Sequence, residues 1–224
     1  MLYLLQIEEI LRMDKRFWAI IGVIIVLFAG ILMINNKSKD KDTSSNSSVK
    51  ATEHIRGKAD SKVKLVEYGD FQCPYCGQFY PIVEQVVAKY QDKISYQFRN
   101  LPLNQIHQNA YAAARAAEAA DEQGKFWDMY NLLYQNQKDW SELTSANATF
   151  NGYAQQLGLN VTQFKKDFAS SKVNDRINAD KEAFNKTGEQ MSTPTFFLNG
   201  KKIEATSADA FGKLIDAELK KNGQ

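Results

Sequence analysis

The sequence has few of the features that mark specialised protein classes. It contains only two cysteines, four prolines and 12 glycines in 224 residues. So few cysteines exclude a small domain held together by many disulfides, and so few prolines and glycines exclude collagen-like and proline-rich chains. Neither sign of charge dominates, because 28 basic residues stand against 26 acidic ones and leave a net charge of +2. This balance provides no electrostatic footprint for nucleic acid, and we expect no nucleic-acid partner.

The overall composition is that of a globular protein. Hydrophobic residues make up 44% of the chain and charged residues 24%, which excludes disorder over the whole length. The length suffices for one medium domain or two small ones.

One long hydrophobic run lies near the N-terminus. Residues 17–34 contain 18 residues without a charge, enough at about 1.5 Å per residue to cross the hydrocarbon core of a bilayer. The basic region 1–16 precedes it, as in a signal sequence, and Met13 is a second candidate start. The run is longer than the core of a cleaved signal and lacks a good small-x-small site. We therefore expect an uncleaved anchor, with a cleaved leader and a buried core helix as alternatives.

A polar stretch separates this run from the rest of the chain. Residues 35–50 are rich in Ser, Asn and charged side chains and have too few apolar groups to form a core, so we expect a flexible linker. Residues 51–224 then form the predicted folded domain.

The hydrophobic periodicity of that domain predicts an α/β fold. Strands are expected at 63–68 and 94–98, with an amphipathic helix between them that contains Pro81. The turn Asn199-Gly200 predicts a β-hairpin over 195–203, and Ser207 is expected to cap a last helix. Further helices are predicted over 105–122, 125–137, from 161 onward with Asn160 as its cap, and 172–186. The order indicates a block of helices inserted between two halves of one sheet.

The two cysteines stand in the motif Cys73-Pro74-Tyr75-Cys76, directly after the first predicted strand. Cys73 is expected near the N-cap of the following helix and Pro74 near its first position, where a missing N–H costs little. Free backbone amides and the helix dipole at that end favour negative charge. The thiolate of Cys73 should therefore be stabilised.

The spacing of the cysteines also allows chemistry between the two sulfurs. One helical turn places them where they can close a small disulfide, with Cys76 as the buried partner. A substrate thiolate can attack Cys73, form a mixed disulfide and be released by a second thiolate. Half of a zinc site, an inert structural disulfide and a pair of buried apolar side chains stay open as other interpretations. Since His54 and His107 do not complete a zinc-site spacing, we expect no metal.

Further motifs surround the cysteines and make the chain resemble a known family. They are HIRG at 54–57, VEYGDFQCPYC at 66–76, FRNLPL at 98–103 followed by His107, EQGKFWDMY at 122–130 and STPTFFLNG at 192–200. Together with a proline eight residues after Cys73, they resemble the bacterial DsbA-like thiol-disulfide oxidoreductases of the thioredoxin superfamily. The resemblance covers His54 to about Leu219. It implies a thioredoxin fold with a helical insertion at about 104–188.

The resemblance also implies roles for single residues. Pro194, after Thr193, matches the cis-proline beside the active-site disulfide of this family, and the Thr193 backbone would pair with an extended substrate segment. Glu67 matches a buried acid that could relay a proton to or from Cys76, although a strand position facing solvent is the alternative. Tyr75 departs from the histidine of the strongest oxidants, so the oxidising strength is not given by the motif.

Other residues are expected to be structural. We expect His107 at the surface or as a helix cap, and Phe126, Trp127 and Tyr130 in the core. Trp140 and Phe150 are candidates for covering the groove beside the cysteines.

The implied function is that of an extracytoplasmic dithiol oxidase. The Cys73–Cys76 disulfide would be its only redox group and no further cofactor is expected. It would be donated to reduced secreted or surface polypeptides and restored by a quinone-linked membrane partner. The implied location is the cell membrane, with one membrane pass and the catalytic domain outside the cytoplasm, or export if the leader is cleaved.

Two other functions are compatible with the same residues. A membrane-anchored reductase or isomerase would use the motif with the opposite direction of electron flow, which depends on the reduction potential. A non-catalytic peptide-binding module would use the groove without turnover. Neither the substrates, the redox partner nor the oligomeric state follows from the sequence.

Overall fold

The computed structural model describes residues 49–223. The basic region 1–16, the hydrophobic run 17–34 and nearly all of the linker 35–50 lie outside this range, so the expected anchor stays a prediction. Among the described residues, no helix is long and apolar enough to cross a membrane.

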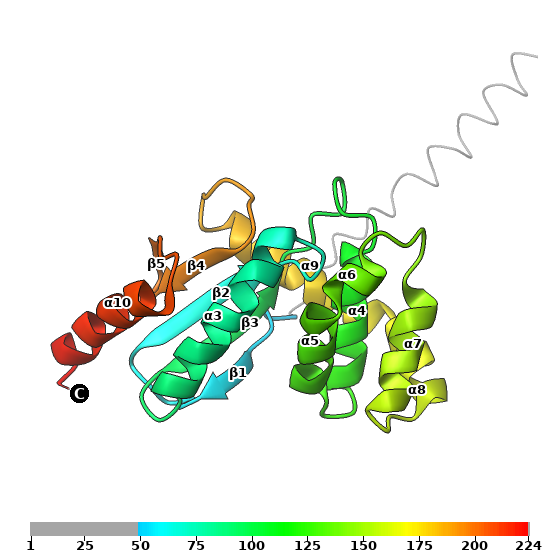
Figure 1. Cartoon of the computed structure of the whole chain (residues 1–224), viewed down its shortest axis with the longest axis horizontal. Helices are drawn as coiled ribbons and strands as arrows, with labels where there is room; N and C mark the ends of the chain where they lie inside the picture. Colours follow the sequence, from blue (N-terminus) through cyan, green and yellow to red (C-terminus); the bar gives the residue numbers. More distant parts are fainter. Residues whose placement is uncertain (1–48, 224) are drawn as a thin grey trace, which may run out of the picture. The chain divides into compact units, whose positions relative to one another are not determined.

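A five-stranded mixed sheet forms the centre of the domain (Figure 1). Its strands are β1 (His54–Gly57), β2 (Lys64–Gly69), β3 (Ser95–Asn100), β4 (Thr195–Leu198) and β5 (Lys201–Ile203). They are ordered β1-β3-β2-β4-β5. Strands β2 and β3 are parallel and every other pair is antiparallel.

The alternation of side chains gives the sheet two buried faces. Leu65 of β2 and Phe196 of β4 belong to the main core, which contains the apolar side of α3 (Pro74–Tyr90) and of α10 (Ala208–Lys221). Tyr68 and Phe197 point the other way, because successive strand residues face opposite sides, and pack against Phe184. That phenylalanine comes from α9 (Ser171–Asn185). Helices α3 and α10 therefore cover one face of the sheet, and α9 covers the other.

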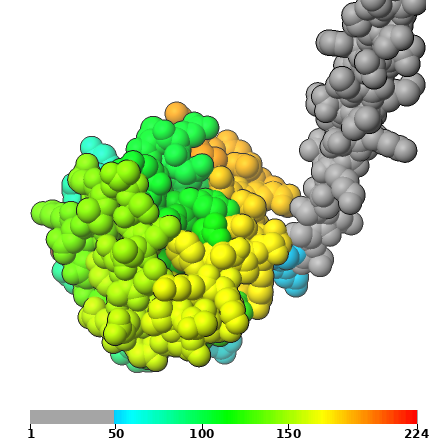
Figure 2. Space-filling model, turned by 90° about the vertical axis from the view of Figure 1, so that its right-hand side faces the viewer, coloured from blue at the N-terminus to red at the C-terminus, as the bar shows by residue number. Residues whose placement is uncertain are grey.

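Six helices lie between β3 and β4. They are α4 (Ala110–Asp121), α5 (Phe126–Gln135), α6 (Gln137–Trp140), α7 (Asn147–Gln156), α8 (Val161–Phe168) and α9. They form most of the face seen in Figure 2, in green to yellow. This arrangement confirms the predicted α/β fold with helices inserted between two halves of one sheet.

Local signals account for several element boundaries. The side chain of Asn160 accepts a hydrogen bond from the Gln163 amide, and that of Ser207 accepts one from the Ala210 amide, as expected for N-caps. The 195–203 hairpin is present, with Asn199 and Gly200 at positive φ in its turn. The helix expected from residue 105 was wrong at its start, because α4 begins only at Ala110.

Candidate active site

The first cysteine lies where strand β2 gives way to helix α3. Cys73 has extended backbone geometry at the N-cap of α3, and Pro74 occupies the first turn, where no amide hydrogen is needed. The Cys73 thiol donates a 3.3 Å hydrogen bond to the carbonyl oxygen of Thr193. Thr193 precedes Pro194 through a cis peptide bond. The structure thus brings together three residues that the sequence analysis selected, although Cys73 and Thr193 are 120 positions apart.

Both cysteines are free thiols, and the environment of Cys73 favours its thiolate. A hydrogen bond from Cys76 is the largest cause that lowers the pKa of Cys73, from 9.0 to about 6. Burial opposes this shift, while Thr193 and the backbone amides of Cys76 and Tyr75 add to it. Hydrogen bonds to a charged sulfur stabilise the charged form. At neutral pH the first cysteine is therefore mostly ionised.

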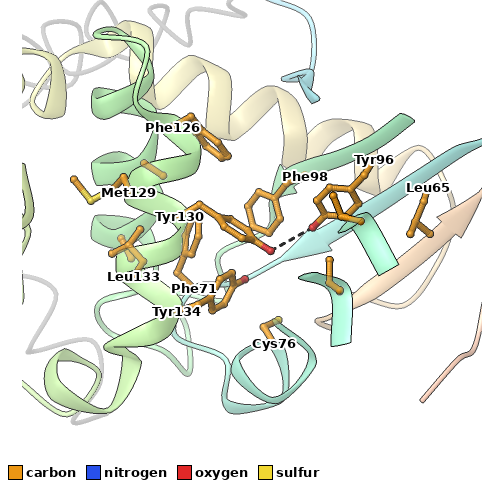
Figure 3. Packing of buried hydrophobic residues seen from close by; sticks show 14 of the residues in the cluster. Leu65, Phe71, Cys76, Tyr96, Phe98, Phe126, Met129, Tyr130, Leu133 and Tyr134 are labelled. Atoms are coloured by element: carbon orange, nitrogen blue, oxygen red, sulfur yellow. Dashed lines mark hydrogen bonds between the residues drawn. The ribbon is translucent and has the colours of Figure 1, made fainter. Parts of the chain in front are cut away.

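The second cysteine has the opposite character. Cys76 is fully buried in the main core, beside the aromatic side chains of Phe71 and Tyr134 (Figure 3). Burial, followed by the hydrogen bond to Cys73, raises the pKa of Cys76 well above its ordinary value. The backbone N–H of Asp70 points at its sulfur, with 3.5 Å between the atoms. The pair thus combines one buried sulfur that ionises readily, Cys73, with one fully buried sulfur that stays protonated, Cys76.

A buried carboxyl group lies near the pair. Glu67 is only 2% exposed, which decides between the two positions that the sequence left open. Burial raises the pKa of Glu67 from 4.5 to about 7, against the hydrogen bond from Tyr96 and the charge of Arg56. The charge of Glu67 in turn raises the pKa of Cys76. The hydroxyl of Tyr96 also lies 3.4 Å from that of Tyr130, as the dashed line in Figure 3 shows.

A groove opens beside Cys73 on the side of the cis peptide. It has a volume of about 450 Å³ and an apolar floor. Tyr75 and Phe79 of α3 form one wall and residues 192–196 and 202–206 form the other. Tyr75 is 65% exposed. Thr193 and Pro194 both line this groove.

The structure adds three residues to the site to which the sequence analysis gave no role beside the cysteines. Gln137, at the start of α6, donates through its amide to the carbonyl oxygens of Phe71 and Cys73, at 2.7 and 2.9 Å. Asp70 is buried and belongs to the same loop between β2 and α3 as Cys73. His107, expected at the surface or as a cap, instead lies 2.7 Å from the Asp70 carboxylate. Asp70 and His107 belong to the motifs that carry the family resemblance, although these motifs do not show that the two residues meet, whereas Gln137 belongs to none of them.

Several aromatic residues of the inserted helices pack in the core. Phe126 and Tyr130 are buried core residues, as predicted, whereas Trp127 is only partly buried and packs against them in one aromatic cluster. Trp140 and Phe150 pack edge to face against each other in the buried core, with ring centres 5.2 Å apart. They do not line the groove. Within residues 49–223, no group of three or more His, Cys, Asp or Glu side chains is arranged to hold a metal ion.

Curated relatives match this chain over most of its folded part. A Na(+)/H(+) antiporter NhaA 3 of Salinispora tropica is 39% identical over 177 residues, which is 76% of this chain and 26% of that protein. A Na(+)/H(+) antiporter NhaA of Herminiimonas arsenicoxydans is 34% identical over 69% of this chain and 23% of its own length. The chain thus spans about a quarter of the length of these relatives. Their names as antiporters therefore do not assign a transport activity to this chain.

Solved structures share the fold at lower identity. BdbD from Bacillus subtilis in its oxidised form superposes with a TM-score of 0.67 at 24% identity, covering 75% of this chain and 93% of that one. Wolbachia pipientis alpha-DsbA1 gives a TM-score of 0.67 at 22% identity, covering 76% and 92%. Residues 49–217 match a sequence family described as thioredoxin. The chain belongs to the thioredoxin family and has the DsbA-like form of its fold.

Proposed function

We propose that this protein is a thiol-disulfide oxidoreductase that donates the Cys73–Cys76 disulfide to reduced polypeptides outside the cytoplasm. The observation that carries the proposal is the difference between the two thiols. Cys73 has a pKa of about 6, whereas that of Cys76 is raised well above 9.0. A stabilised Cys73 thiolate favours the reduced form of the protein, and a protein whose reduced form is favoured is an oxidant.

The reaction balances through one mixed disulfide. A substrate thiolate attacks Cys73 Sγ, the bond between the two cysteine sulfurs breaks, and Cys76 leaves as a thiolate that takes up a proton. A second substrate thiolate then attacks the substrate sulfur of the mixed disulfide, and Cys73 leaves as a thiolate. The substrate loses two electrons and the cysteine pair gains them. Recovery of the disulfide requires an electron acceptor, for which we propose a quinone-linked membrane protein.

Two features supply what the two steps need. Glu67 has a pKa of about 7, near the ideal value for moving a proton at neutral pH, and we propose that it exchanges the proton with Cys76. The groove between Tyr75 and Pro194 would hold an extended segment of the substrate beside Cys73, with the Thr193 backbone as its pairing edge. The apolar floor of this groove suits unfolded chains, which expose apolar side chains.

Equilibration of the full chain against a glutathione series tests the direction of electron flow. Because the pKa of Cys73 is below the value of about 7 known for thioredoxin, we expect a potential well above roughly −270 mV, toward the value of roughly −120 mV found for strong oxidants. A value near −270 mV would indicate a reductant instead. The second measurement is the reoxidation of reduced ribonuclease A, which Cys73→Ser should abolish. If neither the wild type nor Cys73→Ser oxidises the substrate and both bind it equally, only a peptide-binding module is left.

A further inference from the structure

The loop that precedes α3 carries a buried acid that contacts both cysteines. The Asp70 carbonyl oxygen accepts a 3.1 Å hydrogen bond from the Cys73 amide, and the Asp70 amide points at Cys76 Sγ. Its carboxylate is buried as well, and accepts bonds from the amides of Gln72 and Leu103, at 2.7 and 2.9 Å. Two backbone amides thus satisfy this carboxylate inside the protein. Its negative charge lies next to a site that must stabilise a thiolate.

The inserted segment provides the compensating positive charge. His107 lies before α4 and its Nδ1 is 2.7 Å from Asp70 Oδ2. The hydrogen bond to Asp70, followed by that carboxylate's charge and the charge of Cys73, raises the pKa of His107, while burial opposes the shift. His107 is 15% exposed, so the ion pair is partly shielded from water. Pro74 and Tyr75, between the cysteines, offer no positive charge of their own.

We infer that His107 is a positioning residue for the thiol pair: it neutralises Asp70 and holds the loop so that the Cys73 thiolate is favoured. Opposite charges in contact cancel at a distance, so the cysteines experience a neutral pair in place of a bare carboxylate. The same contact ties the insertion to the loop that positions both sulfurs. This inference rests on the proposed function and extends it, because it assigns part of the oxidising strength to a residue outside the motif.

Other titratable groups surround the pair. His107 lines a cavity of about 860 Å³ together with Tyr134 of α5 and with polar residues of α6 and the segment after it. The titratable ones there are Lys138, Asp139 and Glu142. None of these forms an ion pair with Asp70 or His107. His107 of this cavity thus pairs with Asp70 of the cysteine loop.

The variant His107→Asn tests the inference, because the Asn amide takes the place of Nδ1 as a donor to Asp70 but carries no charge. We expect the pKa of Cys73, followed by thiolate absorbance, to rise. We also expect the equilibrium constant for reduction of the disulfide by glutathione to fall about three- to tenfold, since one pKa unit is a factor of ten. Asp70→Asn removes the negative charge and should shift both quantities in the opposite direction. Gln105→Asn, at an exposed position of the same segment, is the matched control.

The outcomes separate the inference from general damage and from the proposed function. If His107→Asn stays within twofold of the wild type, or if both variants shift the two quantities in the same direction, the inference is wrong. A thermal unfolding curve of each variant checks that it is folded, and the double variant Asp70→Asn/His107→Asn should return toward the wild type. Failure of the proposed function would appear differently, as a wild-type protein without a reversible glutathione equilibrium. The thiolate titration would still test His107 in that case.

Discussion

The hydroxyl of Tyr96 donates a 2.6 Å hydrogen bond to the buried carboxylate of Glu67. This bond stabilises the ionised form, yet burial outweighs it and keeps the pKa of Glu67 near 7. The two effects together produce a carboxyl group that gains and loses its proton around neutral pH. An acid fully paired with a cation would stay ionised there, and one without any donor would stay protonated.

Glu67→Gln should change the pH dependence of stability. The folded pKa of about 7 lies above the ordinary 4.5, so the wild type loses stability as the pH rises from about 4.5 to 7, by an amount on the order of 3 kcal/mol. The glutamine variant lacks this loss. Urea unfolding of the reduced protein should therefore show that the free energy of unfolding of the variant, relative to that of the wild type, increases between pH 5 and pH 8. An unchanged difference would mean that Glu67 titrates normally, and Glu142→Gln, at an exposed position, is the control.

Cys76→Ala should raise the pKa of Cys73. The hydrogen bond from Cys76 is the largest cause of the shift to about 6, and alanine cannot donate one. We expect the pKa of Cys73 to rise by at least about one unit, which is a tenfold decrease in its ionisation constant. Absorbance of the single remaining thiolate measures it directly. Cys76→Ser keeps a hydroxyl donor and should give a lower value than alanine; equal values in the two variants would exclude the hydrogen bond as the cause.

Gly77→Ala should disturb the contact between α3 and α6. A Cβ at Gly77 would overlap Gln137 Oε1, so the glutamine must move away from the two carbonyls that it binds. Each lost hydrogen bond costs about 0.5–1.5 kcal/mol, which outweighs the gain from replacing a helical glycine. Gly152→Ala in α7 meets nothing within 4 Å and should instead be stabilising by about 0.5–1 kcal/mol. Urea unfolding of both variants gives the comparison, and equal effects would contradict the steric account.

Thr52→Val should loosen the start of the folded domain. The amide and hydroxyl of Thr52 donate to the two carboxylate oxygens of Asp180, at 2.6 and 2.7 Å. Burial raises the pKa of Asp180 from 3.8 to about 6, so the lost hydroxyl matters most above pH 6, where the carboxylate is charged. We expect a loss of about 1.5–3 kcal/mol at pH 8 and a smaller one at pH 5. Thr144→Val, at an exposed position, serves as the reference. A loss of stability that does not change with pH would mean that the effect of Thr52 does not depend on the ionisation of Asp180.

Local sequence patterns predicted those parts of the fold that depend on neighbouring residues. The strand β2, the hairpin β4–β5 and the caps Asn160 and Ser207 each follow from a few consecutive residues. The position of the cysteines at the start of α3 follows in the same way, since Pro74 suits a first turn.

Elements formed by distant contacts were not predicted. Strand β1 has only four residues, and its His54 ring stacks on Phe126 at 3.4 Å between centres. Helix α7 contains asparagine, threonine and glycine, which are weak helix formers, and is held by buried Phe150 and Ala154. Propensity alone does not favour either element.

For the candidate site too, the sequence predicted what neighbouring residues determine and left open what depends on contacts between distant residues. The motif indicated the two cysteines, but the contact of Asp70 with His107 joins residues 37 positions apart. His107 follows a motif of the family resemblance, but nothing in that motif points to a loop on another element. Burial of Glu67 was likewise undecided, because a charged residue on a strand fits either face until its neighbours are known.

The bonds from Gln137 to Phe71 and Cys73, and from Cys73 to Thr193, also order events during synthesis. The cysteines leave the ribosome before Gln137, and Gln137 leaves it before Thr193. Until the segment with Thr193 emerges, Cys73 lacks one of the groups that lower its pKa. A nascent chain at that stage therefore carries a thiol pair of more ordinary reactivity, and the pair acquires its full redox character only after Thr193 has been synthesised.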